Sequence, residues 1–255
     1  MLAFNMKKSD RLAHLTKAIG KLVESETDKT SSHKVQAQAG ELSAWREKTR
    51  QLTFANHGAH TCRDNLLHYH KLLVQLEHSL EKYPPLTKAS PALSFVWRDN
   101  FDPNLALGAA DWRWERAGVL YNVAAALSYL ATSSDRGSAD GVRAACLLFQ
   151  QAAGTIAELR AVIKTAAWRR TPDLADEYLH GLEVLMLAQA QKCFFEKAVA
   201  DDKSHAIISQ LAAECHGLYE DACSRLGSRA LAAALPKEWL EVLEWNRLHF
   251  DGLQH

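Results

Sequence analysis

Apolar residues along most of the chain recur every three or four positions, the spacing that places them on one face of an α-helix. Short polar or proline-containing breaks interrupt this spacing. Helices of such length joined by short loops favour antiparallel neighbours, so the sequence predicts an all-α fold of the solenoid or bundle type. The predicted helices cover residues 11–24, a region between 33 and 52, and residues 59–83, 111–132, 139–165, 173–200, 204–226 and 237–253.

Two short segments show alternation instead of helical spacing. Residues 3–6 and residues 90–97 alternate large apolar side chains with other residues, as strands do. Pairing of the two segments would give a small β-hairpin-like element near the N-terminus. We therefore expect a minor two-stranded element in an otherwise helical protein.

The stretch from residue 180 to residue 214 predicts two consecutive helices with a polar break, where Asp202 or Ser204 can cap backbone N–H groups. Three large apolar residues, Phe194, Ile207 and Leu211, lie outside the inward stripe of the first helix. Periodicity alone favours the core for them, although the many alanines nearby leave the fold able to place large side chains outside. The inward stripe itself consists of Leu182, Leu185, Met186, Gln189 and Cys193.

Charge and cysteine usage narrow the possible classes of protein. Thirty Lys and Arg residues balance thirty Asp and Glu residues. This balance argues against a nucleic-acid-binding protein, which usually has a basic face or a high pI. No apolar run is long enough for a transmembrane segment. Five cysteines without a CxxC pair indicate a reducing, cytosolic compartment in which the thiols pack as small hydrophobes.

The sequence offers no pattern typical of catalysis or of a metal site. Histidines in HGAH (57–60) and HYH (68–70) lack the i, i+4 spacing that places two imidazoles on one helical face. Cys215 and His216 are adjacent and would point about 100° apart on a helix. Neither a GxSxG elbow nor a glycine-rich phosphate loop occurs. We therefore predict a protein that is not an enzyme, with no catalytic residues, no cofactor and no metal site.

Other notable residues are better explained by packing. The tryptophans between residues 97 and 114 suit the core and a helix start. Glu115 and Arg116 suit internal polar contacts. Gly118 and Gly154, both within predicted helices, suit close approach of neighbouring helices.

Several blocks of the sequence, in order, resemble the BRO domain, the endosomal scaffold module of Alix-like and PalA/Rim-like proteins. They are SFVWRDNFD (94–102), WERAGVLYNVAAALSYLA (114–131), DGVRAACLLFQQAAGTIAELR (140–160), and LMLAQAQ (185–191) followed by FFEKA (194–198). The resemblance covers nearly the whole chain, so we interpret residues 1–255 as a single domain. It implies an elongated, curved helical solenoid or bundle with a tetratricopeptide-like core.

The resemblance also implies a function. BRO domains of the Alix type act as non-enzymatic adaptors of endosomal sorting in the multivesicular body pathway. In such domains an exposed hydrophobic patch binds the C-terminal amphipathic helix of a charged multivesicular body protein, an ESCRT-III subunit. The matching positions here are Phe194, Ile207 and Leu211, with Lys197 nearby to meet acidic residues of the partner. We therefore expect a cytoplasmic protein that is recruited to endosomes and reaches their membrane through its partners.

The chain also departs from the family pattern. It lacks the last helices of a BRO domain, which leaves a fragment, a short family member or a partial gene model as alternatives. Segment 103–110 is shorter than the corresponding Alix loop, and Ala139, followed by Asp140, occupies a position that is acidic in Alix. Two other functions stay open: a rhophilin-like signalling adaptor of small GTPases, and a structural paralogue that has lost partner binding.

Overall fold

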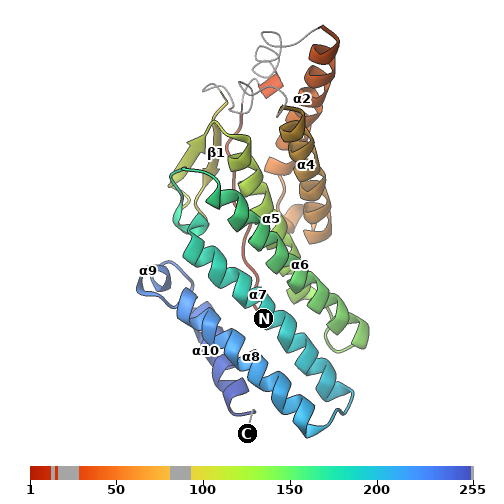
Figure 1. The fold of residues 1–255 in the computed structure, drawn as a ribbon, viewed down its shortest axis with the longest axis vertical. Coiled ribbons are helices and arrows are strands. Elements are labelled where there is room, and N and C mark those ends of the chain that lie inside the picture. The colour runs from red at the N-terminus through yellow and green to blue at the C-terminus, as the bar shows by residue number, and fades with distance from the viewer. Residues whose placement is uncertain (13–14, 17–28, 81–92, 254–255) are drawn as a thin grey trace. The chain divides into compact units, whose positions relative to one another are not determined.

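A computed structural model describes residues 1–12, 15–16, 29–80 and 93–253 (Figure 1). Contacts within the chain divide it into two compact units. Unit 1 comprises residues 1–5, 124–160 and 172–255, and unit 2 comprises residues 6–123 and 161–171. Most of the described chain is helical, with one small sheet, which confirms the predicted fold class. That residues 1–255 act as a single domain stays a prediction.

Unit 2 contains helices α2 (Lys29–Arg50), α3 (Phe54–His57) and α4 (Ala59–Leu80), two strands, and the first part of α5 (Trp112–Ser133). Helices α2 and α4 pack on each other. The Thr53 side chain accepts a hydrogen bond from the Asn56 N–H and so caps the start of α3. Nearly all of the helix predicted over residues 11–24 lies outside the described residues.

The sheet differs from the predicted pairing. Strand β1 (Phe95–Arg98) pairs antiparallel with β2 (Ala106–Ala109), which immediately follows along the chain. Backbone hydrogen bonds join the opposite edge of β1 to residues 8–10: the Asp10 N–H donates to the Val96 carbonyl and the Arg98 N–H to the Lys8 carbonyl, at 3.0 and 2.9 Å. The prediction that residues 3–6 pair with residues 90–97 is therefore wrong in its partner.

A buried polar cluster joins the elements of unit 2. The Glu115 carboxylate, 1% exposed, accepts hydrogen bonds from Arg46 Nε at 2.9 Å, the Tyr69 hydroxyl at 3.0 Å and Trp97 Nε1 at 2.7 Å. Four side chains from α2, α4, β1 and α5 thus share one charge-assisted network. The prediction that Glu115 makes an internal polar contact is confirmed.

The two glycines predicted to allow close packing differ. A methyl group on Gly118 would overlap the Trp97 ring, so this glycine does permit a close approach, although to a strand residue instead of a helix. No heavy atom lies within 4 Å of the corresponding position on Gly154, which is exposed within its helix. The prediction for Gly154 is therefore wrong.

Unit 1 contains residues 124–133 of α5, most of α6 (Ala139–Lys164), the 3₁₀ turn η2 (Pro172–Leu174), and the helices α7 (Asp176–Ala200), α8 (His205–Leu226), α9 (Arg229–Ala232) and α10 (Lys237–Asp251). Helix α8 packs on α7 and on α10, as Figure 1 shows. The helix predicted from residue 173 begins as η2, and α7 follows from Asp176. No helix among the described residues is both long enough and apolar enough to cross a membrane.

The predicted inward stripe of α7 is confirmed, since all five of its residues are buried. One of them is polar and has its own partner. The Gln189 side-chain amide donates to the Leu2 carbonyl at 3.0 Å, and its oxygen accepts from the Leu2 N–H. The Phe4 N–H donates to the Ser128 hydroxyl at 3.3 Å. Alternation at residues 3–6 thus reflects docking of Phe4, 4% exposed, against helices and not membership of a sheet.

Candidate partner-binding site

A tight turn between α7 and α8 positions the predicted site residues. The Asp201 N–H donates to the Lys197 carbonyl at 2.9 Å, and the Lys203 N–H donates to the Ala198 carbonyl at 3.0 Å. Asp202 adopts the left-handed backbone conformation, with φ of 51°, which reverses the chain. Ser204 is the N-cap residue of α8, but its side chain makes no capping hydrogen bond.

The apolar side chains left out of the α7 stripe are exposed. Phe194 is 47% exposed and Ile207 is 46% exposed, while Leu211 is partly exposed. A buried residue adjoins two of them in sequence: Cys193 lies beside Phe194, and Ala212 lies beside Leu211. We call Phe194, Ile207 and Leu211 the apolar ridge. Core burial, which periodicity alone favours, is wrong for Phe194 and Ile207.

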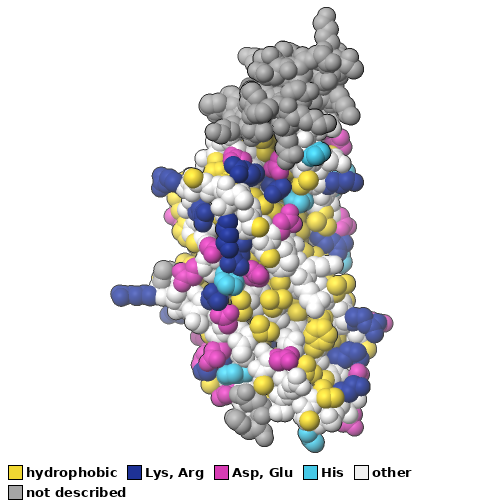
Figure 2. All heavy atoms as spheres, viewed as in Figure 1, with side chains coloured by type: hydrophobic (Ala, Val, Ile, Leu, Met, Phe, Trp, Pro, Cys, Tyr) yellow, Lys and Arg dark blue, Asp and Glu magenta, His cyan; other side chains and the backbone are white. Residues whose placement is uncertain are grey.

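Adjacent phenylalanines in α7 have different environments because successive helical residues point about 100° apart. Phe195 is half-buried and packs edge-on against Phe250 of α10, with ring centroids 5.2 Å apart. Phe250 also stacks on Tyr219 of α8. Phe194 therefore points away from the α7–α8–α10 core. Hydrophobic side chains gather over α7 on the face seen in Figure 2.

The α7–α8 register places ridge residues side by side. The Gln191 side-chain amide donates to the Glu214 carboxylate at 2.6 Å across the two helices. In an antiparallel pair, three residues forward on α7 correspond to three residues back on α8, so Phe194 lies level with Leu211. The ridge is thus one surface built from two helices.

Lys197 has an acidic partner within its own helix end. Its Nζ lies 3.0 and 2.8 Å from the two carboxylate oxygens of Asp201. This hydrogen-bonded ammonium lowers the pKa of Asp201 below its ordinary value. An acidic residue of a partner would therefore share Lys197 with Asp201.

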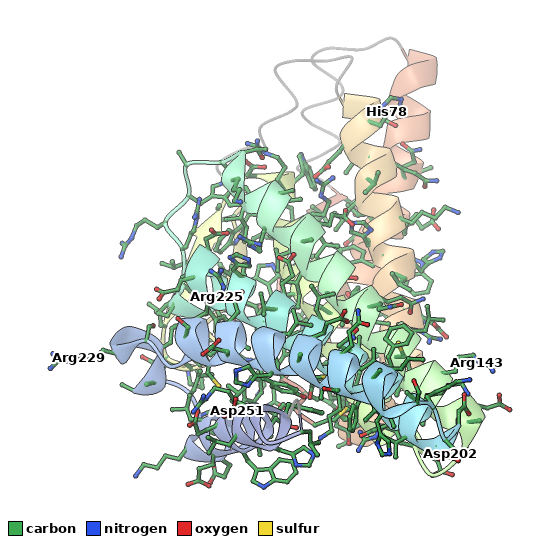
Figure 3. The ribbon with its side chains drawn as sticks, turned by 60° about the horizontal axis from the view of Figure 1, so that its bottom comes forward. His78, Arg143, Asp202, Arg225, Arg229 and Asp251 are labelled. Atoms are coloured by element: carbon green, nitrogen blue, oxygen red, sulfur yellow. The ribbon has the colours of Figure 1, made fainter. Side chains whose placement is uncertain are left out.

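A cavity of about 530 Å³ lies beside Lys197, and its lining includes residues of the α5–α6 connection. Arg136 from this connection pairs with Glu196 of α7 at 3.2 Å. Ala139 lines the cavity and contributes no charge to it. The neighbouring Asp140 carboxylate is almost fully exposed and pairs with Arg143 at 3.3 Å. Figure 3 shows Arg143 and Asp202, both of unit 1, toward the same side of that view. This cavity could not be predicted from the sequence, because Arg136 and Glu196 are far apart along the chain.

Cys215 and His216, the adjacent pair weighed for catalysis, have different environments. Burial raises the pKa of Cys215 to about 12, so its sulfur stays a thiol. His216 Nδ1 lies 3.1 Å from the Arg247 carbonyl of α10. Within the described ranges, no cluster of three or more His, Cys, Asp or Glu side chains could hold a metal ion.

Residues 1–255 match the family model of the BRO1-like domain. The chain is 30% identical over 240 residues to ALG-2 interacting protein X of Dictyostelium discoideum, which covers 94% of this chain and 29% of that protein. It is 37% identical over 161 residues to the pH-response regulator protein palA/RIM20 of Emericella nidulans, which covers 62% of this chain and 19% of that protein. The chain thus spans less than a third of the length of either relative.

Solved structures share the fold over the whole chain. A complex of the ALIX BRO1 domain with CHMP4C matches with a TM-score of 0.84 at 26% identity, covering 100% of this chain and 71% of that chain. A structure described as the basis for endosomal targeting by the Bro1 domain matches with a TM-score of 0.79, covering 100% of this chain and 68% of that chain. At 17% identity, this second match shows the fold alone.

Proposed function

Because the chain belongs to the BRO1-like domain family, we propose that it is a non-enzymatic scaffold of endosomal sorting that binds an ESCRT-III subunit. The proposed site is the apolar ridge together with Lys197. Its occupant is the C-terminal amphipathic helix of a charged multivesicular body protein. Recruitment to endosomes follows from that contact. The complex between the ALIX BRO1 domain and CHMP4C supports this class of partner.

The observation that carries the proposal is the exposure of Phe194 and Ile207 beside a buried core. Large apolar side chains at neighbouring positions form a surface that an amphipathic helix can cover, and charges at its edge set the register. Full burial of such a side chain stabilises by about 1.5–3 kcal/mol, and about half of that is still available at each of these two residues. With the partner's own apolar residues, the ridge supports a complex in the micromolar range, which suits reversible assembly.

The direct test is Ile207→Asp, measured by fluorescence polarisation with a labelled C-terminal helix peptide of CHMP4C. A carboxylate in the apolar contact would have to lose water on binding, so we expect affinity to fall at least about tenfold. Circular dichroism should show an unchanged fold, because Ile207 is 46% exposed.

Val199→Asp is the matched control. Val199 is β-branched and 49% exposed, and it lies on α7 about 140° around the helix from Phe194. We expect it to bind the peptide as wild type does. The proposal is wrong if the wild-type chain does not bind, or if folded Ile207→Asp binds as tightly as Val199→Asp.

A further inference from the structure

The exposed apolar surface of α7 and α8 extends beyond the ridge. Leu187 lies seven residues before Phe194 and is 39% exposed, and Leu218 lies seven residues after Leu211 and is partly exposed. Seven residues return an α-helix to within about 20° of the same face and advance it by about 10 Å. Each helix therefore presents a second apolar side chain on its ridge face, two turns farther from the α7–α8 turn.

Contacts along the hairpin show that the two added residues lie level with each other. From the Gln191–Glu214 hydrogen bond, four residues back on α7 and four forward on α8 lead to Leu187 and Leu218. The antiparallel register persists to the far end, where a methyl group on Gly181 would meet the side chains of Leu226 and Arg225. We call Leu187 and Leu218 the second apolar row.

Gln191 and Glu214 form a polar pair between the apolar ridge and the second apolar row, and the negative charge of Glu214 is not compensated. Glu214 is exposed and accepts a hydrogen bond from the neutral Gln191 amide. No ion pair joins Glu214 to a basic side chain of the described chain. By contrast, Lys197 at the other end of the ridge is already paired with Asp201. The middle of the surface therefore favours a cation from outside.

We propose that the docking surface includes the second apolar row and selects an amphipathic helix with two apolar clusters seven residues apart and a Lys or Arg between them. This deepens the function proposed above and rests on it. Ile207 of α8 lies level with residue 198 of α7. The surface therefore extends along α7 from residue 198 to residue 187, about 16 Å or three helical turns. A helix that covers all of it matches both apolar levels and places its basic residue against Glu214.

The test uses two labelled designed peptides with a strong helical propensity. Both have a leucine cluster for the ridge and a central lysine, and only one has a second leucine cluster seven residues away, replaced by alanine in the other. On the wild-type chain we expect the two-cluster peptide to bind about tenfold more tightly. On the Leu187→Ala/Leu218→Ala variant, this difference between peptides should disappear while binding of the one-cluster peptide is unchanged.

Leu248→Ala is the matched control for that variant. Leu248 is 53% exposed on α10, which packs on α8 through Phe250 and Tyr219, and it should keep the tenfold difference. Glu214→Gln should weaken binding of both peptides several-fold at low salt and reduce the salt dependence of binding.

Equal binding of both peptides to wild type, or a tenfold difference that survives Leu187→Ala/Leu218→Ala, overturns the proposal that the second apolar row is part of the docking surface. In either case, loss of one-cluster binding in Ile207→Asp would leave the proposed function standing, whereas failure of the CHMP4C peptide to bind wild type refutes that function.

Discussion

Gly118 and Gly154 allow one substitution to be compared in two environments. Both glycines lie inside helices, where alanine is intrinsically more favourable by about 0.5–1 kcal/mol. At Gly118 the added Cβ would lie 2.5 Å from Cδ2 of the Trp97 ring, and at Gly154 it would meet no heavy atom within 4 Å. We therefore expect Gly118→Ala to destabilise the protein and Gly154→Ala to stabilise it.

The expected cost at Gly118 follows from the position of Trp97. Ordinary contacts between carbon atoms are about 3.5–4 Å, so the ring must move by an ångström or more. Such overpacking costs about 1–3 kcal/mol. Movement of the ring also stretches the 2.7 Å hydrogen bond from Trp97 Nε1 to the buried Glu115, which adds about 1–3 kcal/mol. After the gain in helix propensity, we expect the free energy of unfolding to fall by about 3 kcal/mol.

Urea denaturation followed by circular dichroism and tryptophan fluorescence measures both variants. Gly154→Ala is expected to raise the free energy of unfolding by about 0.5–1 kcal/mol, since no contact opposes the gain in propensity. If Gly118→Ala is as stable as Gly154→Ala, the close approach of α5 to Trp97 is not the reason for glycine at position 118, and our account of the Glu115 network is wrong.

Three further predictions concern polar groups that are buried or half-buried. Lys192→Met removes the ammonium that lies 2.8 Å from the Asn246 side-chain oxygen, so urea denaturation should show a loss of about 1–3 kcal/mol, largely recovered by adding Asn246→Leu. Glu115→Ala leaves the buried Arg46 without its carboxylate partner, so the free energy of unfolding in the same assay should fall by about 3–5 kcal/mol. A fall of less than about 1 kcal/mol, the size expected for an exposed ion pair, would contradict the network. Burial lowers the pKa of His180 below its ordinary value of 6.5, so the unfolded chain binds the proton more readily and stability falls as pH drops through 6.5. His180→Gln should reduce that slope between pH 7 and pH 5, and an unchanged slope would count against it.

Helices were predictable from the sequence because their signal is local, whereas the strand pairing was not. Strand β2 has the sequence ALGA, without β-branched or aromatic residues, so it gives no strand signal. Gly108 within it permits a close approach, since a Cβ there would lie 2.5 Å from Ser94 Oγ. The alternation around Phe4 resembles a strand, but it is produced by packing against helices that are more than a hundred residues away in sequence.

For the candidate site, the sequence predicted the ridge residues only through family resemblance. Two adjacent phenylalanines look equivalent in a periodic pattern, and the distinction between them depends on Phe250, which comes from the last described helix. Leu187 falls within the motif LMLAQAQ and could have been recognised by its seven-residue distance from Phe194. The level of Leu218 with Leu187 required the Gln191–Glu214 contact, which no local pattern contains.

Helices α7 and α8 have apolar residues both in the core and at their flanks. Small residues take buried positions on both helices, including Ala188 and Ala198 on α7 and Ala212 and Ala222 on α8. Small buried side chains allow two helices to approach closely where they meet. Larger apolar residues of the same helices are either buried, as Leu182 and Leu226 are, or lie at the flanks, as Phe194 and Ile207 do, where folding buries only part of them. Substitutions on the flanks should therefore change partner binding with little effect on stability, while enlarging a buried alanine should change both.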